Sequence, residues 1–355
     1  MNRRGIAGAG SALGQAAALA AAIAAVVLMP QQVELFDLMQ YTLFAAMGIL
    51  ALSLGFIWGF GGILSFGQTA FFGLGAYAYA VAAINFGDST GAVALAILVP
   101  AGFALVLGYF VFYGRISDVY LGVITLTVTL ILFNLVNSTA GDEYRIGEAA
   151  LGGFNGMPSI PGLNAPGNPD YLLDPEELWF VTGGALILVY VLLRLLLASR
   201  FGRVAVAIRE NETRASLLGY DPRLTKLAVF VIGGGIAGLA GCLYANWGAF
   251  VSPTIFSLAL SAEIIIWVTV GGLGTLIGPV IGCVLIQYTV AQIGSQQAFN
   301  SNLVLGVILI AFVLLLRKGL VPTAQDLCGR LVALVRRRAG RAGRAKGLGT
   351  LKEAE

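Results

Sequence analysis

Apolar residues fill long stretches of this chain, and charged residues are confined to the connections between them. Between residues 38 and 114 the only charged residue is Asp88, and between residues 227 and 316 the only one is Glu263. A helix that crosses a bilayer needs about 20 mostly apolar residues, because the hydrocarbon core is about 30 Å thick and each residue rises about 1.5 Å. These stretches therefore predict membrane-spanning helices.

Polar turns divide the apolar stretches into ten expected spans, which makes the chain an all-α, polytopic membrane protein. Residues 1–36 are expected to hold the first span and an outer turn, residues 37–320 the main transmembrane domain, and residues 321–355 a basic, disordered tail on the cytoplasmic side. The expected spans begin near Ile6, Asp37, Ser65, Ala92, Val119, Glu177, Lys226, Ala262, Leu276 and Asn302.

The positions of the basic residues predict the orientation, because Lys and Arg prefer the cytoplasmic ends of spans. If the N-terminus lies inside, 19 of the 21 basic residues lie inside, Arg145 lies outside, and Arg194 lies near the inner end of the sixth span. Adding or removing one span in the middle would send the 199–226 loop or the Arg-rich tail outward. Both ends of the chain are therefore expected inside.

The first 30 residues allow two interpretations. Arg3 and Arg4 precede an Ala-rich run, which is the order of a secretory signal. Cleavage would leave nine spans with the same orientation. We favour an uncleaved first span.

The expected outer segment 138–176 is rich in Pro and acidic residues. It contains five of the 11 Pro, and we expect a structured loop or cap, either as a docking surface for an outside partner or as a plain polar connector. Its seven acidic residues are Asp142, Glu143, Glu148, Asp170, Asp174, Glu176 and, at its edge, Glu177.

Composition narrows the possible chemistry. The chain is 58% hydrophobic and 11% charged, against roughly 45–50% and 25% in soluble domains, which excludes an ordinary cytosolic enzyme. It contains no His, so no imidazole can serve as base or metal ligand. None of its four Lys follows a Gly, so no phosphate-binding loop is present. We expect no catalytic residues, metal or cofactor, and Cys242, Cys283 and Cys328 are expected to be small apolar fillers.

The scarcity of acids inside the expected spans also bears on function. Secondary carriers usually place several acids in the membrane as proton or sodium sites, and Glu263 stands nearly alone here. A self-sufficient ion-coupled carrier is therefore disfavoured, although sodium sites built from backbone carbonyls would leave no trace in the sequence.

The inner loop 199–226 predicts a short amphipathic helix. One face would hold Val204, Ala207, Ile208, Ala215 and Leu218, with Gly219 as its stop. Asp221 and Pro222 fit the cap and first turn of the next helix. The balanced charge of residues 203–214 favours docking into a cytoplasmic protein over binding to anionic lipid.

Glycine-rich segments predict close helix packing and two breaks. Pairs spaced by four, such as Gly234 and Gly238, allow helices to approach closely. Residues 59–77 and 270–279 have too many Gly for a continuous helix, and broken backbone at membrane depth lies in protein or beside a cavity. The two segments are weakly alike, which hints at an internal repeat.

Polar residues near these breaks are candidates for the translocation pathway. Glu263 has two interpretations of equal weight, an interfacial position and a role in the pathway or in a hydrogen-bond network. The candidates are Ser65, Gln68, Glu263, Thr269, Gly271, Gly272 and Gly274, with Thr69, Ser261 and Thr275 nearby.

Three motifs in the same order closely resemble the permease family of branched-chain amino acid ABC importers, specifically its LivM type. They are GILSFGQTAFFGLGAYAYA (62–80), RFGRVAVAIRENETRASLLGYD (200–221) and SAEIIIWVTVGGLGTLIGPVIG (261–282), and LGGFNG (151–156) looks like an element that precedes the outer loop in this group. The resemblance covers about residues 37–317.

The resemblance implies a transport subunit of the bacterial inner membrane that hydrolyses no ATP itself. Its partners would be a second permease subunit, two cytoplasmic ATPase subunits, a periplasmic substrate-binding protein and membrane lipid, without nucleic acid. Importers of urea and short-chain amides share nearly the same pattern, so the substrate stays open. The implied ATPase-coupling residues are Arg209, Glu210, Asn211, Arg214, Gly219 and Asp221.

Overall fold

The computed structural model describes residues 19–114, 116–141, 143–165, 168–294, 306 and 319–324. The expected start of the first span, the span near Asn302, Cys328 and the tail from residue 325 lie outside these residues.

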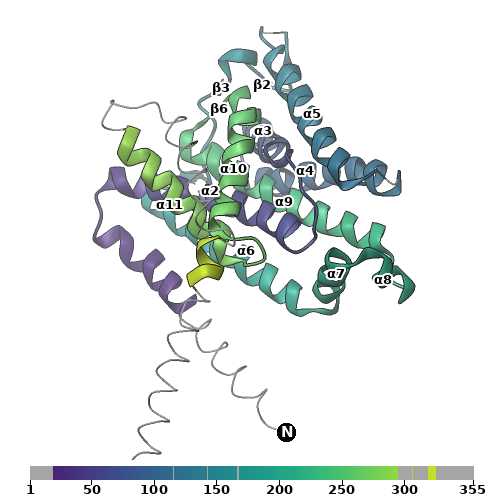
Figure 1. Ribbon diagram of the computed structural model, residues 1–355. Helices are drawn as coiled ribbons and strands as arrows, with labels where there is room; N and C mark the ends of the chain where they lie inside the picture. The colour runs from purple at the N-terminus through teal and green to yellow at the C-terminus, as the bar shows by residue number, and fades with distance from the viewer. Residues whose placement is uncertain are drawn as a thin grey trace, which may run out of the picture.

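Eight long helices form a bundle, and they begin at most four residues from the predicted starts (Figure 1). An apolar segment at Leu19–Gln31 precedes them, and its last turn is the 3₁₀ helix η1 (Met29–Gln31). The helices are α2 (Leu35–Gly59), α3 (Gln68–Phe86), α4 (Ser89–Tyr113), α5 (Asp118–Asn137), α6 (Pro175–Ala198), α9 (Pro222–Gly248), α10 (Leu258–Gly271) and α11 (Ile277–Gly294).

Fewer than ten helices reach the length of a full span in the described part of the chain. Six of them are long and apolar enough to cross a bilayer, namely α2 to α6 and α9. Helix α10 has 14 residues and so extends about 21 Å, less than the hydrocarbon thickness of about 30 Å. Its short length follows from the 3₁₀ helix η3 (Pro253–Phe256) before it and from Gly272, with φ at +114°, after it.

Glycines bring α9 into backbone contact with α3 and α4. A Cβ added to Gly75 of α3 would lie 2.3 Å from the Gly238 carbonyl oxygen, and one on Gly241 would lie 2.0 Å from the Phe72 carbonyl oxygen. Gly238 also lies against the Pro100 ring of α4. Small residues permit this approach where lipid cannot separate the helices.

The predicted break at residues 59–77 is correct only in its first half. Residues 60–67 form a loop, but α3 then runs unbroken through Gly73 and Gly75. Both of these glycines face close neighbours, Gly73 the ring of Phe256 and Gly75 the backbone of Gly238. Tertiary packing therefore overrides the low helix propensity of glycine in this segment.

Residues 138–174 form a structured segment that we name the cap. It contains β1 (Arg145–Ile146), β2 (Ala149–Ala150), η2 (Gly153–Asn155), β3 (Met157–Pro158), β4 (Asn164–Ala165) and β5 (Asn168–Leu172). β1 pairs with β2, β4 with β5, and β3 with β6 (Phe250–Val251) in the α9–α10 connection, each antiparallel.

Two asparagines attach the cap to the turn between α3 and α4. The Asn85 side chain accepts from the Glu148 N–H and donates to the Ile146 carbonyl, both at 2.8 Å. The Asn164 Oδ1 accepts from the Ser89 N–H at 2.7 Å. The Thr90 N–H and the Asn164 amide donate to the Asp88 carboxylate, which lowers the pKa of that group.

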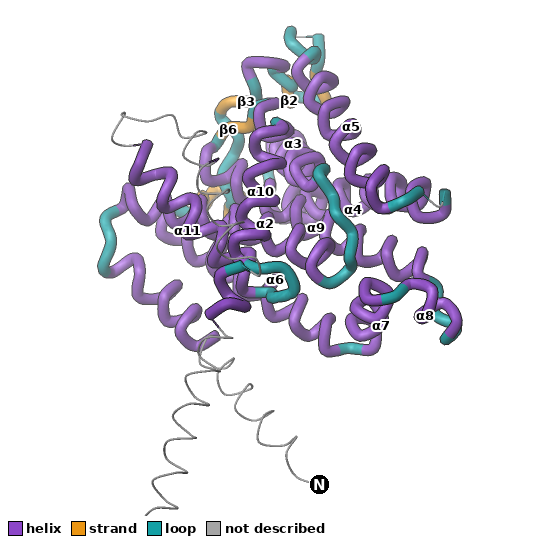
Figure 2. The backbone as a smooth tube through the Cα atoms, in the orientation of Figure 1, coloured by secondary structure: helices purple, strands orange, loops and turns teal. Residues whose placement is uncertain are grey.

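Connections gather at the two opposite ends of the bundle (Figure 2). We name one the cap end, where the cap meets residues 87–88 and 249–257, and the other the loop end, where the end of α2 and residues 60–62 meet residues 199–221 and 272–276. Successive helices therefore cross the bundle in alternating directions. The loop end holds most of the described basic residues, namely Arg200, Arg203, Arg209, Arg214, Arg223 and Lys226.

The segment before η1 packs on α6. The Trp179 indole N–H donates to the Val26 carbonyl at 2.8 Å, and a Cβ on Gly183 would lie 2.9 Å from the Val26 side chain. Trp179 forms a small apolar cluster with Leu38 and Ala45 of α2.

Replacing Gly75 with Ala is expected to destabilise the bundle by about 1–3 kcal/mol, because the new methyl group would overlap the Gly238 backbone. The measurement is the midpoint of thermal unfolding in detergent. Gly102→Ala on α4 is the matched control, since nothing lies within 4 Å of its added Cβ, and it is expected to leave the midpoint unchanged or raise it. Equal midpoints for the two variants would contradict the packing argument.

Candidate functional site

Two helices, rather than the single expected one, occupy the inner loop. They are α7 (Arg200–Glu210) and α8 (Glu212–Leu217). The chain breaks at Asn211, whose φ of −161° and ψ of 99° are extended, and whose Oδ1 accepts from the Arg214 N–H at 2.8 Å. Asn211 thus ends α7 and caps α8. Short polar side chains bond to nearby backbone groups in this way and so compete with the hydrogen bonds of a continuous helix, which lowers their helix propensity.

The break also corrects the predicted apolar face. Ile208 and Ala215 are buried as expected, but Ala207 and Leu218 are exposed, and Val204 is only half-buried. Ala205, which the prediction left out, is buried. One continuous helical period cannot describe both helices, because the extended residue between them changes the phase.

An exposed apolar tip follows α8 and was missed by the sequence reasoning. The side chains of Leu217 and Leu218 are 83% and 73% exposed, and Tyr220 and Leu224 are exposed beside them. Gly219 has a φ of +89° with open space around it, as expected for a residue that ends a helix. Clustered exposed apolar side chains are typical of surfaces that contact another protein or a membrane.

Polar contacts fix the ends of α8 and α9. The Asp221 Oδ1 accepts from the Arg223 N–H at 2.9 Å and so caps α9, as predicted from Asp221 and Pro222. The Lys226 ammonium pairs with the Glu212 carboxylate at 2.7 Å. These bonds connect the inner helices to the start of a long span.

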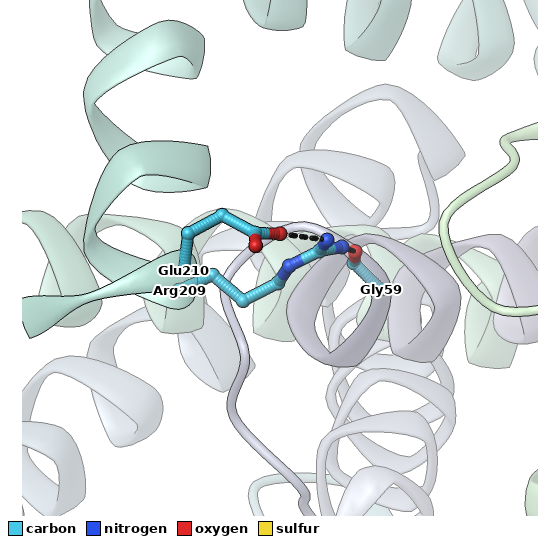
Figure 3. Close-up of polar contacts among 3 residues, drawn as sticks. All are labelled: Gly59, Arg209 and Glu210. Atoms are coloured by element: carbon cyan, nitrogen blue, oxygen red, sulfur yellow. Dashed lines mark hydrogen bonds and ion pairs between the residues drawn. The ribbon is translucent and has the colours of Figure 1, made fainter.

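Arg209 points into the bundle (Figure 3). Its Nη1 donates to the carbonyl oxygen of Gly59, the last residue of α2, and its Nη2 pairs with the Glu210 carboxylate at 2.5 Å. The Arg209 side chain is 33% exposed and that of Glu210 is 66% exposed. The structure therefore brings Arg209 and Glu210 together at the loop end, between α7 and α2.

The second glycine-rich turn packs against the end of α2, where the first glycine-rich turn begins. We name residues 60–67 and 272–276 the glycine turns. A Cβ on Gly59 would lie 3.0 Å from the Gly274 nitrogen, and one on Gly271 would lie 1.9 Å from the Gly278 carbonyl oxygen. The break predicted for residues 270–279 is present, with α10 ending at Gly271 and α11 beginning at Ile277.

The polar pathway candidates are not gathered into one site. Gln68 is buried and donates from Nε2 to the Ser53 hydroxyl at 2.7 Å and to the Gly233 carbonyl at 3.3 Å. The Ser65 hydroxyl is buried and accepts from the Gly67 N–H at 3.2 Å. Gln68 therefore joins the start of α3 to α2 and α9, whereas the Ser65 bond stays within the loop.

The candidates on α10 lie along one helix. Glu263 and Thr269 are half-buried, and the Thr269 hydroxyl donates to the Ile265 carbonyl at 2.7 Å. The nearby Thr69 and Ser261 hydroxyls are buried and lie 2.7 Å apart, which joins α3 to α10. Gly274 meets the end of α2, whereas Gly271 lies against Gly278 at the start of α11.

A cavity of about 550 Å³ between α3, α4, α5 and the cap was also missed by the sequence reasoning. It is lined mainly by apolar side chains, including Leu74, Leu95 and Phe256, and none of its lining residues is charged. Tyr77 lines it and is buried, and its hydroxyl has no hydrogen-bond partner among the described residues. The described residues contain no group of His, Cys, Asp or Glu that could hold a metal ion.

A family model described as "Branched-chain amino acid transport system / permease component" matches residues 38–314. The chain belongs to this permease family. The matched range includes the inner helices, both glycine turns and the cap, but not the segment before α2.

Two curated relatives of this permease chain are named for the transport of different substrates. The "High-affinity branched-chain amino acid transport system permease protein LivM" of Escherichia coli K12 is 29% identical over 301 residues, covering 78% of this chain and 68% of the relative. The "Autoinducer 2 import system permease protein LsrC" of Salmonella typhi is 27% identical over 220 residues, covering 60% of this chain and 61% of the relative. No solved structure matches.

Proposed function

We propose that this permease chain is one of two transmembrane subunits of an ATP-driven importer of branched-chain, hydrophobic amino acids in the bacterial inner membrane. The observation that carries the proposal is the similarity to LivM over 78% of the chain. A urea or short-chain amide importer is the alternative, and an ion-coupled carrier is less favoured because Glu263 is the only acid within the helices from α9 to α11.

In this proposal the loop end lies in the cytoplasm and the cap end lies outside, with ten spans in total. The support is the concentration of Arg and Lys at the loop end, against Arg145 in the cap. The alternation of the described helices between the two ends agrees with this orientation.

The cytoplasmic ATPase subunits dock on α7, α8 and the exposed tip. The support is the combination of the exposed Leu217 and Leu218 with charged side chains beside them, which is the composition of a protein interface. The docking segment contains the six predicted coupling residues, Arg209, Glu210, Asn211, Arg214, Gly219 and Asp221.

Substrate passes beside the glycine turns, and a second permease subunit supplies the other wall of the passage. Irregular backbone in a membrane protein persists where it is buried in protein or lines a cavity, and both glycine turns are of this kind. The proposed pathway residues stay as predicted, Ser65, Gln68, Glu263, Thr269, Gly271, Gly272 and Gly274.

A substrate-binding protein delivers the amino acid at the cap. The support is the rigid attachment of the cap through Asn85 and Asn164, which gives a partner a fixed surface. Specificity then lies largely in that binding protein, in accord with the lack of charged residues around the described cavity.

Uptake of radiolabelled L-leucine tests the proposed activity. The chain, purified with its partner subunits and placed in liposomes, is expected to take up leucine only with ATP and the binding protein. Excess isoleucine and valine should compete, whereas urea and acetamide should not. Uptake by this chain alone, driven by an ion gradient, would contradict an ATP-driven importer, and competition by acetamide alone would favour the alternative.

Replacement of Leu217 and Leu218 with Asp tests the docking surface. Because buried anchors supply most of the binding energy of an interface, the amount of ATPase that copurifies is expected to fall roughly tenfold or more. Leu172→Asp in the cap is the matched control, since Leu172 is also exposed and lies at the other end of the bundle. An unchanged yield of ATPase with the double variant would remove the docking assignment.

A reporter fused after Gly152 tests the orientation. An alkaline phosphatase fusion at this position in the cap is expected to be active, because that enzyme requires the oxidising space outside the membrane. A fusion after Gly219 is expected to be inactive. The opposite pattern would invert the proposed orientation.

A further inference from the structure

The Arg209 side chain reaches from α7 toward Gly59 at the end of α2 (Figure 3). It lies at the end of α7, yet its guanidinium reaches the Gly59 carbonyl, 150 residues earlier in the sequence. A residue whose main role was to bind an ATPase would present its guanidinium to solvent. Arg209 instead joins an inner helix to the end of a membrane-spanning helix.

The Gly59 carbonyl suits a cationic partner. In a continuing helix it would accept from the Ile63 N–H, but that N–H donates to the Ile57 carbonyl at 3.2 Å. The last carbonyls of a helix lack helical partners and carry partial negative charge. The guanidinium therefore caps α2, and charge-assisted bonds of this kind are among the strongest hydrogen bonds in proteins.

The same side chain lies against both glycine turns. A Cβ on Gly62 would be 2.7 Å from the Arg209 Cγ, so the aliphatic stem of the arginine occupies the space that a side chain would need. A Cβ on Gly274 would be 3.8 Å from Nη1. One residue of α7 thus contacts the end of α2 and both turns.

Arg203 shows that this arrangement is not a general property of arginines on α7. It also donates to a carbonyl at the end of a long helix, that of Ala198 in α6, at 2.8 Å. Ala198 is five residues away in the sequence, so this bond stays within one helix corner. The bond of Arg209, in contrast, connects α7 directly to the end of α2.

We propose that Arg209 is the positioning residue that transmits movement of α7 and α8 to both glycine turns. The inference rests on the proposed function, because an ATPase must move these helices. It also revises the role predicted for Arg209, from a contact with the ATPase to a link inside the permease. The ATPase binds the exposed tip and displaces α7 and α8. This displacement passes through Arg209 to Gly59 and from Gly59 to Gly274.

The test is hydrogen exchange in the full complex with its partner subunits, without nucleotide and with ATP plus vanadate. In the wild type, nucleotide is expected to change amide exchange in residues 199–221 and in both glycine turns. In Arg209→Gln, the change in residues 199–221 and the copurified ATPase should persist. The change in the turns should fall roughly tenfold or more, because the charged bond is lost.

Arg203→Gln is the matched control, and the nucleotide response of the turns is expected to stay at the wild-type level. Arg209→Met provides a second variant, because it keeps an unbranched stem beside Gly62 and loses the guanidinium that bonds to the Gly59 carbonyl. If Arg209→Gln fails to insert into the membrane, this second variant replaces it in the experiment. Its glycine turns should likewise lose the change in amide exchange that nucleotide causes.

Three results would overturn the inference. If the turns of Arg209→Gln still followed nucleotide as in the wild type, Arg209 would not be the link, while the importer proposal would stand. If Arg209→Gln lost the ATPase itself, Arg209 would be a partner contact. If residues 199–221 of the wild type did not respond to nucleotide, the proposed function and the inference would fail together.

Discussion

Backbone contact between glycines is the constraint on which the bundle depends. Helices in a bilayer gain little from apolar burial alone, because lipid tails are as apolar as their side chains. Close packing must supply the stability, and the contact of Gly75 with Gly238 brings α3 and α9 nearer than side chains would allow. The same rule operates at the loop end, where Gly59 meets Gly274. The glycines thus determine both the core of the bundle and the position of its turns.

The two ends of the molecule are held in different ways. At the cap end, asparagine side chains and short strand pairs attach a folded segment to the α3–α4 turn. At the loop end, the Arg209 bond to Gly59, the Lys226–Glu212 ion pair and glycine contacts join the inner helices to the long helices. An end held by many small bonds suits a stationary platform for a partner, whereas an end held by a few strong bonds can move as a unit.

The sequence predicted the starts of eight helices to within four residues, because the alternation of apolar stretches and polar turns is unambiguous. It could not predict that α10 is short, since Ser257, η3 and Gly272 limit that helix within an apolar stretch. It also predicted an unbroken inner helix, because the periodicity gave no sign that Asn211 would cap a second one. These errors arise where local hydrogen bonds compete with a hydrophobic pattern.

Sequence reasoning selected the candidate residues of the site but not their arrangement. The charged inner loop and both glycine turns were selected from the sequence, but nothing there shows that Arg209 reaches Gly59. Such a contact joins residues 150 positions apart, and residue types alone do not encode it. Leu218 was assigned to the apolar face of a single amphipathic helix, and Leu217 was not singled out, because the helical period continued past Asn211 does not place the two side by side.

The contact of Trp179 with Val26 has a consequence for the biogenesis of the protein. Removal of residues 1–30 by a signal peptidase would take away the acceptor of the indole N–H, and an unpaired N–H in an apolar setting costs about 1–3 kcal/mol. It would also uncover Gly183 and part of the cluster around Leu38. The residues just before α2 therefore stabilise the folded bundle through the contacts of Val26.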